Sequence, residues 1–294
     1  MSDDFSLSKR ALLVKLSVPS AQSRRKDVGQ SEESASRAGA DAGLVSTVVS
    51  VIPPEYAKPI TSAGRRVSEE NKLLTLAWDD DGGRILPVDV QVAHAAEMQR
   101  FIPEFNREVE KFAENLPAIK QAAKNRLGTM FREENYESPD AFRARMKIRL
   151  NYYPIPQKDD FRVDLDADSI SWLRSSLEDD VNERLKSAMD GLKARMAVSV
   201  EEFITRLSKF EERMNADGDM EIVHNVRSSL ITNVSDLVKL VPGLNITKDD
   251  EITNLNREMA RVCCTYSIQK LRASPDARKI ALRDAQDLLN KMKS

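Results

Sequence analysis

The feature that most constrains this chain of 294 residues is a row of thirteen apolar side chains in its C-terminal half. Successive members are three or four residues apart, a mean of about 3.67, which fits a straight α-helix better than the 3.5 of a left-handed coiled coil. The spacing predicts one long amphipathic helix from Asp166 and Asp168 to Asp217 and Gly218, with a break near Ser199. The thirteen are Ile170, Leu173, Leu177, Val181, Leu185, Met189, Leu192, Met196, Val200, Phe203, Leu207, Phe210 and Met214.

Helical patterns continue to the end of the chain. We expect three more helical segments, at about 219–240, 249–272 and 275–293, separated by Pro242-Gly243 and Ser274-Pro275. The chain has only 10 Gly and 5% aromatic residues, and 31% of its residues are charged, a composition that favours helices over turn-rich β architecture. Residues 166–294 are therefore predicted to form a helical region.

The N-terminal half mixes strand and helix signals. Residues 10–18 (RALLVKLSV) predict a buried strand, and the polar, Ser-rich residues 20–43 predict a mobile loop with a helical turn at its end. Helices are expected at 55–74 and, divided at Pro103 or Pro117, over 88–127, while Asp81-Gly82-Gly83 between apolar runs predicts a β-hairpin. The predicted fold class is α+β, predominantly α, with a small β-sheet in an α+β domain at 1–165.

A basic stretch, RARMKIRLNYYPIP, follows a helix-start signal. Ser138 can cap a helix that begins at Pro139, so Arg143 and Arg145 are expected on that helix, with Lys147 and Arg149 on a strand that follows. A second short strand is expected at 161–165. Cations beside aromatic rings suit single-stranded nucleic acid, whereas the alternative is that they solvate the surface and protect a sheet edge. The candidate contact residues are Arg143, Arg145, Lys147, Arg149, Tyr152, Tyr153 and Arg162; Arg24, Arg25 and Lys26 form a second basic cluster.

Motifs that would indicate catalysis are missing from the sequence. It contains no GxxxxGK[ST], GxGxxG, HExxH or GxSxG, and no protein-kinase signature. His94 and His224 are far apart, and the acids of WDDDGG lack the alternation of an EF-hand loop. We therefore expect no catalytic residue, no metal ligand and no cofactor, although a dispersed carboxylate cluster of a metal-dependent nuclease is not ruled out by motif analysis.

Charge and cysteine content bear on the setting of the protein. A net charge of −2 argues against a dedicated basic nucleic-acid binder but allows a local basic patch. Cys263 and Cys264 are adjacent, a spacing that disfavours a disulfide, and suit a reducing compartment. No window has about 18 uninterrupted apolar residues. We expect a cytoplasmic protein without membrane contact.

Local motifs also resemble a known family. LLTLAWDDDGGRILP and ENYESPDAFRARMKIRLNYYPIPQKDDFRVDL, with the first strand and the long helix, resemble an uncharacterised family called domain of unknown function 3150, which occurs in bacteriophages and integrative conjugative elements. The 20–43 loop departs from that pattern. The resemblance implies mobile-element origin, with the host-cell cytoplasm as the location if the protein is phage-encoded. It also implies a setting near DNA recombination genes and a MoxR or cobaltochelatase-like ATPase, but it transfers no activity to any residue.

Two functional classes follow. The first is a non-enzymatic interaction or assembly protein that uses its amphipathic helices for a protein partner or self-association, with the MoxR or cobaltochelatase-like ATPase as one partner to consider. Its alternative is that the helices only bury one another within a monomer. The second class is a single-stranded DNA-binding or annealing protein that acts as an oligomer.

Overall fold

The computed structural model describes residues 7–21, 24–157, 167–214, 220–224 and 227–293. The chain divides into two compact units. Unit 1 comprises Met1–Val14, Leu74–Val92 and Tyr152–Ser294, and unit 2 comprises Lys15–Leu73 and Ala93–Asn151. Each unit is therefore assembled from segments that are separated in the sequence.

The largest sheet has four strands in the order β4-β5-β1-β6. These are β1 (Ala11–Ser17), β4 (Leu76–Ala77), β5 (Gly83–Pro87) and β6 (Arg149–Tyr153). The expected first strand is thus confirmed, and so is the hairpin, because β4 and β5 pair antiparallel with Leu76 opposite Ile85. Gly82 has a φ of 84°, which a side chain would strain, and the Gly83 amide donates to Asp79 Oδ1 at 2.6 Å to close the turn.

Unit 2 is built on two long helices. α2 (Pro54–Leu73) begins at a proline suited to a first helical position, and α3 (Val88–Glu114) contains Pro103 without ending there. The predicted division of the 88–127 stretch occurs at Asn115, where α4 (Leu116–Leu127) begins with Pro117 in its first turn. At the contact between α2 and α3, Gly64 lies so close to Phe105 and Val18 that an added Cβ would be 2.9 Å from the valine.

The prediction of a loop over 20–43 was wrong. This segment contains β2 (Arg24–Asp27) and α1 (Val28–Ala38), and β2 pairs antiparallel with β3 (Thr47–Ser50). Asp27 caps α1 by accepting from the Gln30 amide at 3.0 Å, and Gly39 ends the helix in the left-handed conformation. The Ser-rich composition therefore predicts a loop where the chain forms a short helix with a cap at each end.

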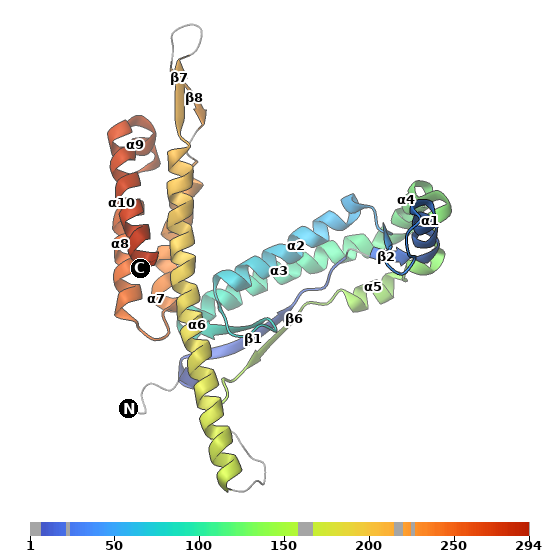
Figure 1. The fold of residues 1–294 in the computed structure, drawn as a ribbon, viewed down its shortest axis with the longest axis horizontal. Helices are drawn as coiled ribbons and strands as arrows, with labels where there is room; N and C mark the ends of the chain where they lie inside the picture. Colours follow the sequence, from blue (N-terminus) through green and yellow to red (C-terminus); the bar gives the residue numbers. More distant parts are fainter. Residues whose placement is uncertain (1–6, 22–23, 158–166, 215–219, 225–226, 294) are drawn as a thin grey trace. The chain divides into compact units, whose positions relative to one another are not determined.

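Unit 1 is dominated by α6 (Ala167–Ser208), a helix of 42 residues. It packs against α7 (Ser229–Leu244), α8 (Asp250–Cys263) and α10 (Pro275–Lys293), with α9 (Ile268–Ala273) beside α10 (Figure 1). The predicted long helix is confirmed but its expected end is wrong, because β7 (Glu211–Met214) and β8 (Met220–His224) form an antiparallel hairpin after it. No break occurs at Ser199, which lies inside the helix.

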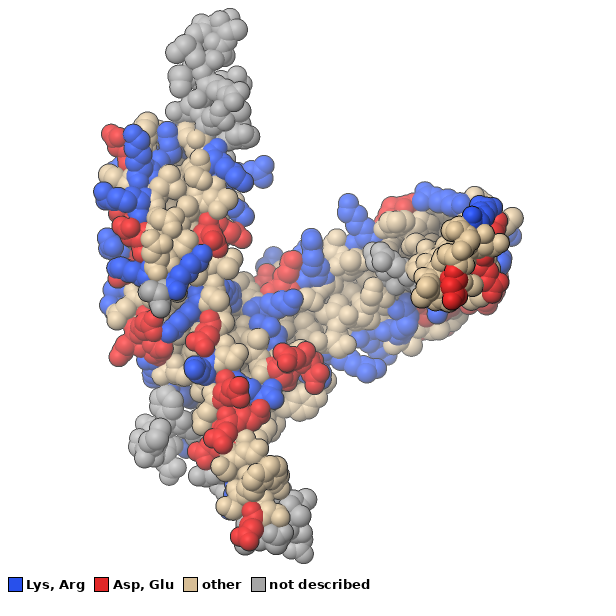
Figure 2. All heavy atoms as spheres, in the orientation of Figure 1, with Lys and Arg blue, Asp and Glu red and all other residues tan. Residues whose placement is uncertain are grey.

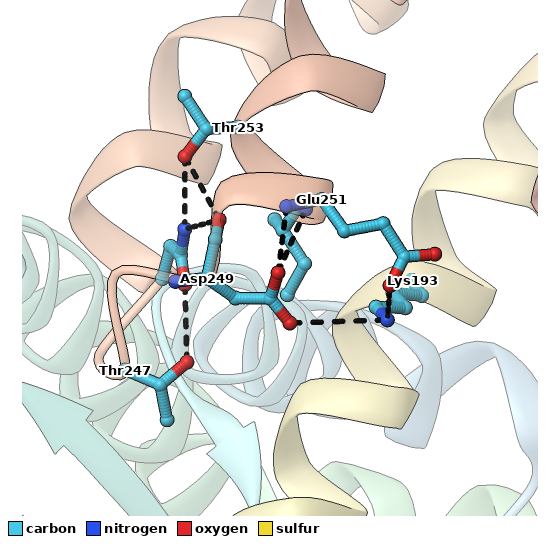
Figure 3. Close-up of polar contacts among 7 residues, drawn as sticks. Lys193, Thr247, Asp249, Glu251 and Thr253 are labelled. Carbon is cyan, nitrogen blue, oxygen red and sulfur yellow. Dashed lines mark hydrogen bonds and ion pairs between the residues drawn. The ribbon is translucent and has the colours of Figure 1, made fainter.

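A polar network ties the start of α8 to α6 (Figure 3). Asp249 caps α8 by accepting from the amides of Glu251 at 2.7 Å and Ile252 at 3.3 Å. Lys193 on α6 forms ion pairs with Glu251 and, at 3.8 Å, with Asp249. The neighbouring Asn245 side chain holds the turn closed by accepting from the Asp249 amide at 3.0 Å. The network fixes where α8 begins relative to α6.

The α+β, mostly α fold class is confirmed: a small antiparallel sheet lies in the N-terminal half and long helices follow it. The proposed boundary between residues 165 and 166 stays a prediction. The strand expected at 161–165 lies outside the described residues. Among the helices that the structure describes, none has the length and apolar composition needed to span a membrane.

A buried histidine in unit 2 makes stability depend on pH. His94 has no exposed surface, and its Nε2 lies 2.9 Å from Oδ1 of Asn71, itself buried. Burial lowers the pKa of His94. Below about pH 6.5 the unfolded chain therefore binds more protons than the folded chain, so this contribution to stability is present above that pH and is lost as pH falls.

We therefore expect the urea midpoint of unfolding to fall between pH 7.5 and pH 5.5, and to fall less in His94→Gln, which cannot titrate in this range. His224→Gln, which replaces the other histidine of the sequence, is the matched comparison for the loss of one titratable imidazole. An unchanged pH dependence in His94→Gln would contradict this assignment.

Candidate functional site

The basic region predicted from the sequence centres on α5 (Pro139–Arg145) in unit 2. The Ser138 side chain accepts from the Ala141 amide at 3.2 Å, so the helix starts where its capping signal predicts. Phe142 is buried and stacks on Phe112 of α3, with ring centroids 4.5 Å apart. This aromatic contact anchors α5 and sets the direction in which its two arginines project.

Both arginines of α5 are engaged by carboxylates. Arg143 donates from Nε to Glu110 Oε2 at 2.9 Å and from Nη1 to Asp140 Oδ1 at 2.9 Å. The hydrogen bonds that Arg143 donates to Glu110 lower the pKa of Glu110 and raise the pKa of Arg143. Each group thus keeps the other charged.

Arg145 is held by three contacts of different kinds. Its Nη2 donates to Glu137 Oε1 at 2.6 Å and its Nη1 to the Ser20 carbonyl at 3.0 Å. Its guanidinium also lies 5.3 Å from the centroid of the Phe142 ring. Arg145 therefore links α5 to the segment after β1, and its charge is already compensated within the fold.

The next two cations are placed differently. Arg149 begins β6, as expected, but Lys147 precedes the strand, so its predicted strand position was wrong. The buried Met146 is the C-terminal cap of α5, so the strand begins only after it. Lys147 and Arg149 are exposed, and within the described part of the chain neither forms an ion pair. These two cations are the uncompensated part of the predicted site.

The remaining candidates are not gathered around α5 by any described contact. Tyr152 and Tyr153 lie at the end of β6, are 43% and 47% exposed, and belong to unit 1. Partial burial raises the pKa of Tyr152. Arg162 lies outside the described residues. The structure thus brings Arg143 and Arg145 together on one helix and places Lys147 and Arg149 directly after it.

A cavity of about 390 Å³ opens beside α5 within unit 2. Its lining combines apolar side chains with charges of both signs. Tyr136, on the wall, donates its hydroxyl to the Val51 carbonyl at 2.6 Å and is therefore held in place. The lining residues are Arg25, Ile52, Leu116, Ile119, Glu134, Asn135, Tyr136, Glu137, Phe142 and Arg145. Such a lining suits binding of a mixed polar and apolar group rather than a polyanion.

Arg25 also lines this cavity, although the sequence predicts it in a separate basic cluster, with Arg24 and Lys26, in the expected loop. In the structure it lies on β2, and it lines the same cavity as Arg145. No local signal could have joined the two, because they are far apart in the chain and share no motif. The pairing of β2 with β3 brings Arg25 to this cavity.

A second surface lies on α6 in unit 1. The predicted apolar stripe runs along the whole helix, yet all the buried members lie in its second half, from Met189 to Leu207. No residue from 168 to 187 is buried, and the five stripe residues there are only partly covered. These five are Ile170, Leu173, Leu177, Val181 and Leu185. We call residues 168–187 the uncovered half of α6.

The cysteines and carboxylates show no reactive arrangement. Burial, with a smaller effect of Cys264, raises the pKa of the Cys263 thiol to about 12, so it stays protonated at neutral pH. Burial also raises the pKa of Cys264. Among the described residues, no three His, Cys, Asp or Glu side chains form a group that could hold a metal ion.

No family model, curated protein or solved structure matches this chain. The resemblance to domain of unknown function 3150 is therefore supported only by the sequence motifs that suggested it. Function has to be argued from the two surfaces, α5 with its cavity and the uncovered half of α6.

The anchoring role of Phe142 can be tested by truncation. Phe142→Ala should lower the free energy of unfolding by roughly 3–5 kcal/mol, because it removes a buried ring and leaves a void against Phe112. Phe142→Leu retains most of the apolar volume and should cost less. Urea unfolding measures both, and equal losses for the two variants would show that the ring is not specifically packed.

Proposed function

We propose that this protein is a non-enzymatic interaction or assembly protein of a bacteriophage or mobile element, accessory to DNA metabolism or to a MoxR or cobaltochelatase-like ATPase. The observation that carries the interaction role is the uncovered half of α6, an apolar stripe that no described element buries. The mobile-element setting and the ATPase rest on the sequence resemblance alone.

Covering the stripe with a partner would remove its apolar surface from water. Burying apolar surface contributes about 25 cal/mol per Å², and amphipathic helices are a common means of docking onto a partner. In the second half of α6 the same stripe is buried: Leu192, Met196 and Val200 pack against neighbouring helices. The uncovered half keeps the same pattern of spacing, and its stripe residues stay partly exposed although Arg184 donates to the Trp78 carbonyl at 3.2 Å. A partly exposed apolar stripe suits contact with another chain.

Hydrogen exchange can test whether the stripe is available. In dilute protein, backbone amides of residues 168–183 should exchange about 1,000-fold faster than those of 188–207, because local opening there exposes no buried core. Mass spectrometry of peptides from the two halves of the same helix gives this comparison within one sample. Equally slow exchange in both halves, at every protein concentration, would overturn the proposed interaction role.

Two leucines of α6 provide a matched control. Leu173→Ala should change the free energy of unfolding of the dilute protein by less than about 0.5 kcal/mol. Leu192→Ala, the same substitution at a buried position, should cost about 2–5 kcal/mol. A large cost at Leu173 in dilute protein would mean that the stripe is already covered within one chain.

A second candidate function is single-stranded DNA binding by an oligomer. Lys147 and Arg149 favour it, because they are exposed and form no ion pair with any residue that the structure describes. Arg143 and Arg145 contribute less, because Glu110, Asp140 and Glu137 already compensate them. Phosphate contacts release counterions, so binding of this kind weakens steeply as salt rises.

If DNA binds here, Lys147→Ala/Arg149→Ala should weaken binding of a labelled oligonucleotide and flatten its dependence on salt by about two ion equivalents. The matched control is Lys58→Ala/Arg107→Ala, which removes two exposed cations elsewhere in unit 2. Fluorescence anisotropy at several salt concentrations measures both. Absence of salt-sensitive binding by the wild-type protein, or equal effects of the two double variants, would rule out this site.

A further inference from the structure

We infer that the uncovered half of α6 pairs with the same segment of a second copy of this chain, antiparallel, about a two-fold axis at Leu177. The inference rests on the proposed interaction role and adds the partner and its geometry. Its support comes from three properties of residues 168–187: their poor intrinsic helicity, their symmetric stripe and the charges that flank it.

This segment lacks the means to be a stable helix alone. Its sequence, DSISWLRSSLEDDVNERLKS, contains five serines, an isoleucine, a tryptophan and a valine, all weaker helix formers than alanine or leucine. In proteins, most helical stability comes from burying the amphipathic face. Because none of residues 168–187 is buried, a cover over the stripe would supply the missing stabilisation.

The stripe is symmetric about Leu177. Leu173 and Val181 each lie four residues from it, and Ile170 and Leu185 lie seven and eight residues away on opposite sides. Two antiparallel copies that cross at Leu177 therefore place leucine on leucine at the centre, Leu173 against Val181, and Ile170 against Leu185. The overlap of residues 170–185 is about 24 Å long at a rise of about 1.5 Å per residue.

The flanks of the stripe decide the direction of pairing. At about 100° per residue, residues that follow stripe positions form one flank, and residues that precede them form the other. The following flank carries Arg174 and Glu178, with Ser171 and Asn182 at its ends. The preceding flank carries Asp180, with Ser169, Trp172 and Ser176. Arg184, seven residues after Leu177 and so about 20° from its direction, lies at the end of the stripe, where it pairs with Asp180 at 2.7 Å and donates to the Trp78 carbonyl at 3.2 Å.

In an antiparallel pair, each flank lies next to the same flank of the second copy, with its residues in the opposite order. Arg174 then meets Glu178 of the second copy, twice by symmetry, and Ser171 meets Asn182. On the other flank, Trp172 meets Asp180. In a parallel pair the two flanks face each other, so Glu178 lies against Asp180 twice, a like-charge contact that destabilises association.

The positions of the charged side chains agree with this assignment. Figure 2 shows acidic side chains gathered along the first half of α6, next to uncharged surface on the same helix. The acids Glu178, Asp179, Asp180 and Glu183 fall between Leu177 and Arg184, whereas residues 169–177 contain no acid. Antiparallel overlap places this acidic stretch opposite residues 169–177, and parallel overlap places it opposite itself.

The test is a measurement of mass against concentration for the full-length protein, by light scattering or sedimentation. Wild type should be dimeric at high concentration. Leu177→Asp should weaken the dimer roughly 100-fold or more, because it places two carboxylates at the apolar centre. Ser175→Asp, which adds the same charge on the opposite side of the same helix, is the matched control and should leave the dimer intact.

Charge reversal tests the direction. Arg174→Glu and Glu178→Arg should each weaken the dimer about 2–10-fold, and the double variant should restore it, because the two residues face each other across the antiparallel pair. In a parallel pair Glu178→Arg would instead strengthen association, an outcome that overturns the antiparallel assignment.

Other outcomes separate this inference from the proposed function. A wild-type protein that stays monomeric at all concentrations, yet exchanges rapidly over 168–183, overturns self-pairing and leaves the stripe as a site for a different protein. A dimer that Leu177→Asp and Ser175→Asp affect equally also overturns it. Slow exchange over 168–183 in the monomer overturns both.

Discussion

The packing of the second half of α6 against α7, α8 and α10 is the contact on which unit 1 depends. Met189, Leu192, Met196, Val200 and Phe203 supply one side of this core, and Lys193 adds ion pairs to the start of α8. Because this packing stabilises the second half of α6 as a helix, the uncovered half extends a helix that has already formed. Helix continuation from an existing turn avoids the cost of nucleation, which lets a weakly helical, Ser-rich sequence present its apolar stripe.

Charge pairing shapes unit 2 in a comparable way. Four arginine and lysine side chains lie within a few residues of α5, but Glu110, Asp140 and Glu137 compensate two of them, so the local charge is less basic than the sequence suggests. These carboxylates come from α3 and from the turn before α5 as well as from α5 itself. A basic motif therefore identifies a phosphate-binding surface only when the acids that fold against it are known.

Local signals in the sequence predicted local structure well. Ser138-Pro139 marked the start of α5, and Asp81-Gly82-Gly83 marked the hairpin, because caps and turns depend on neighbouring residues. The Asp27 cap is equally local, three residues from Gln30, but the Ser-rich composition of that stretch favoured a loop prediction. That Arg25 and Arg145 line one cavity depends on contacts far apart in the sequence, which local signals do not show. Periodicity showed a stripe from Ile170 onward but could not show which half other helices cover, nor that the chain turns into β7 after Ser208.

The order of segments along the chain has a consequence for synthesis. Unit 2 ends at Asn151, so every residue it needs has been made before the ribosome reaches α6. In unit 1, residues 7–14 and the β4–β5 hairpin have to wait for α6 to α10, which are translated after all of unit 2. Unit 2 can thus fold before α6 is made, whereas unit 1 closes only once its late helices have emerged from the ribosome, through contacts such as Arg10 with the Ile246 carbonyl. Early apolar strands of unit 1 are consequently exposed to chaperones for most of the time that the chain is being made.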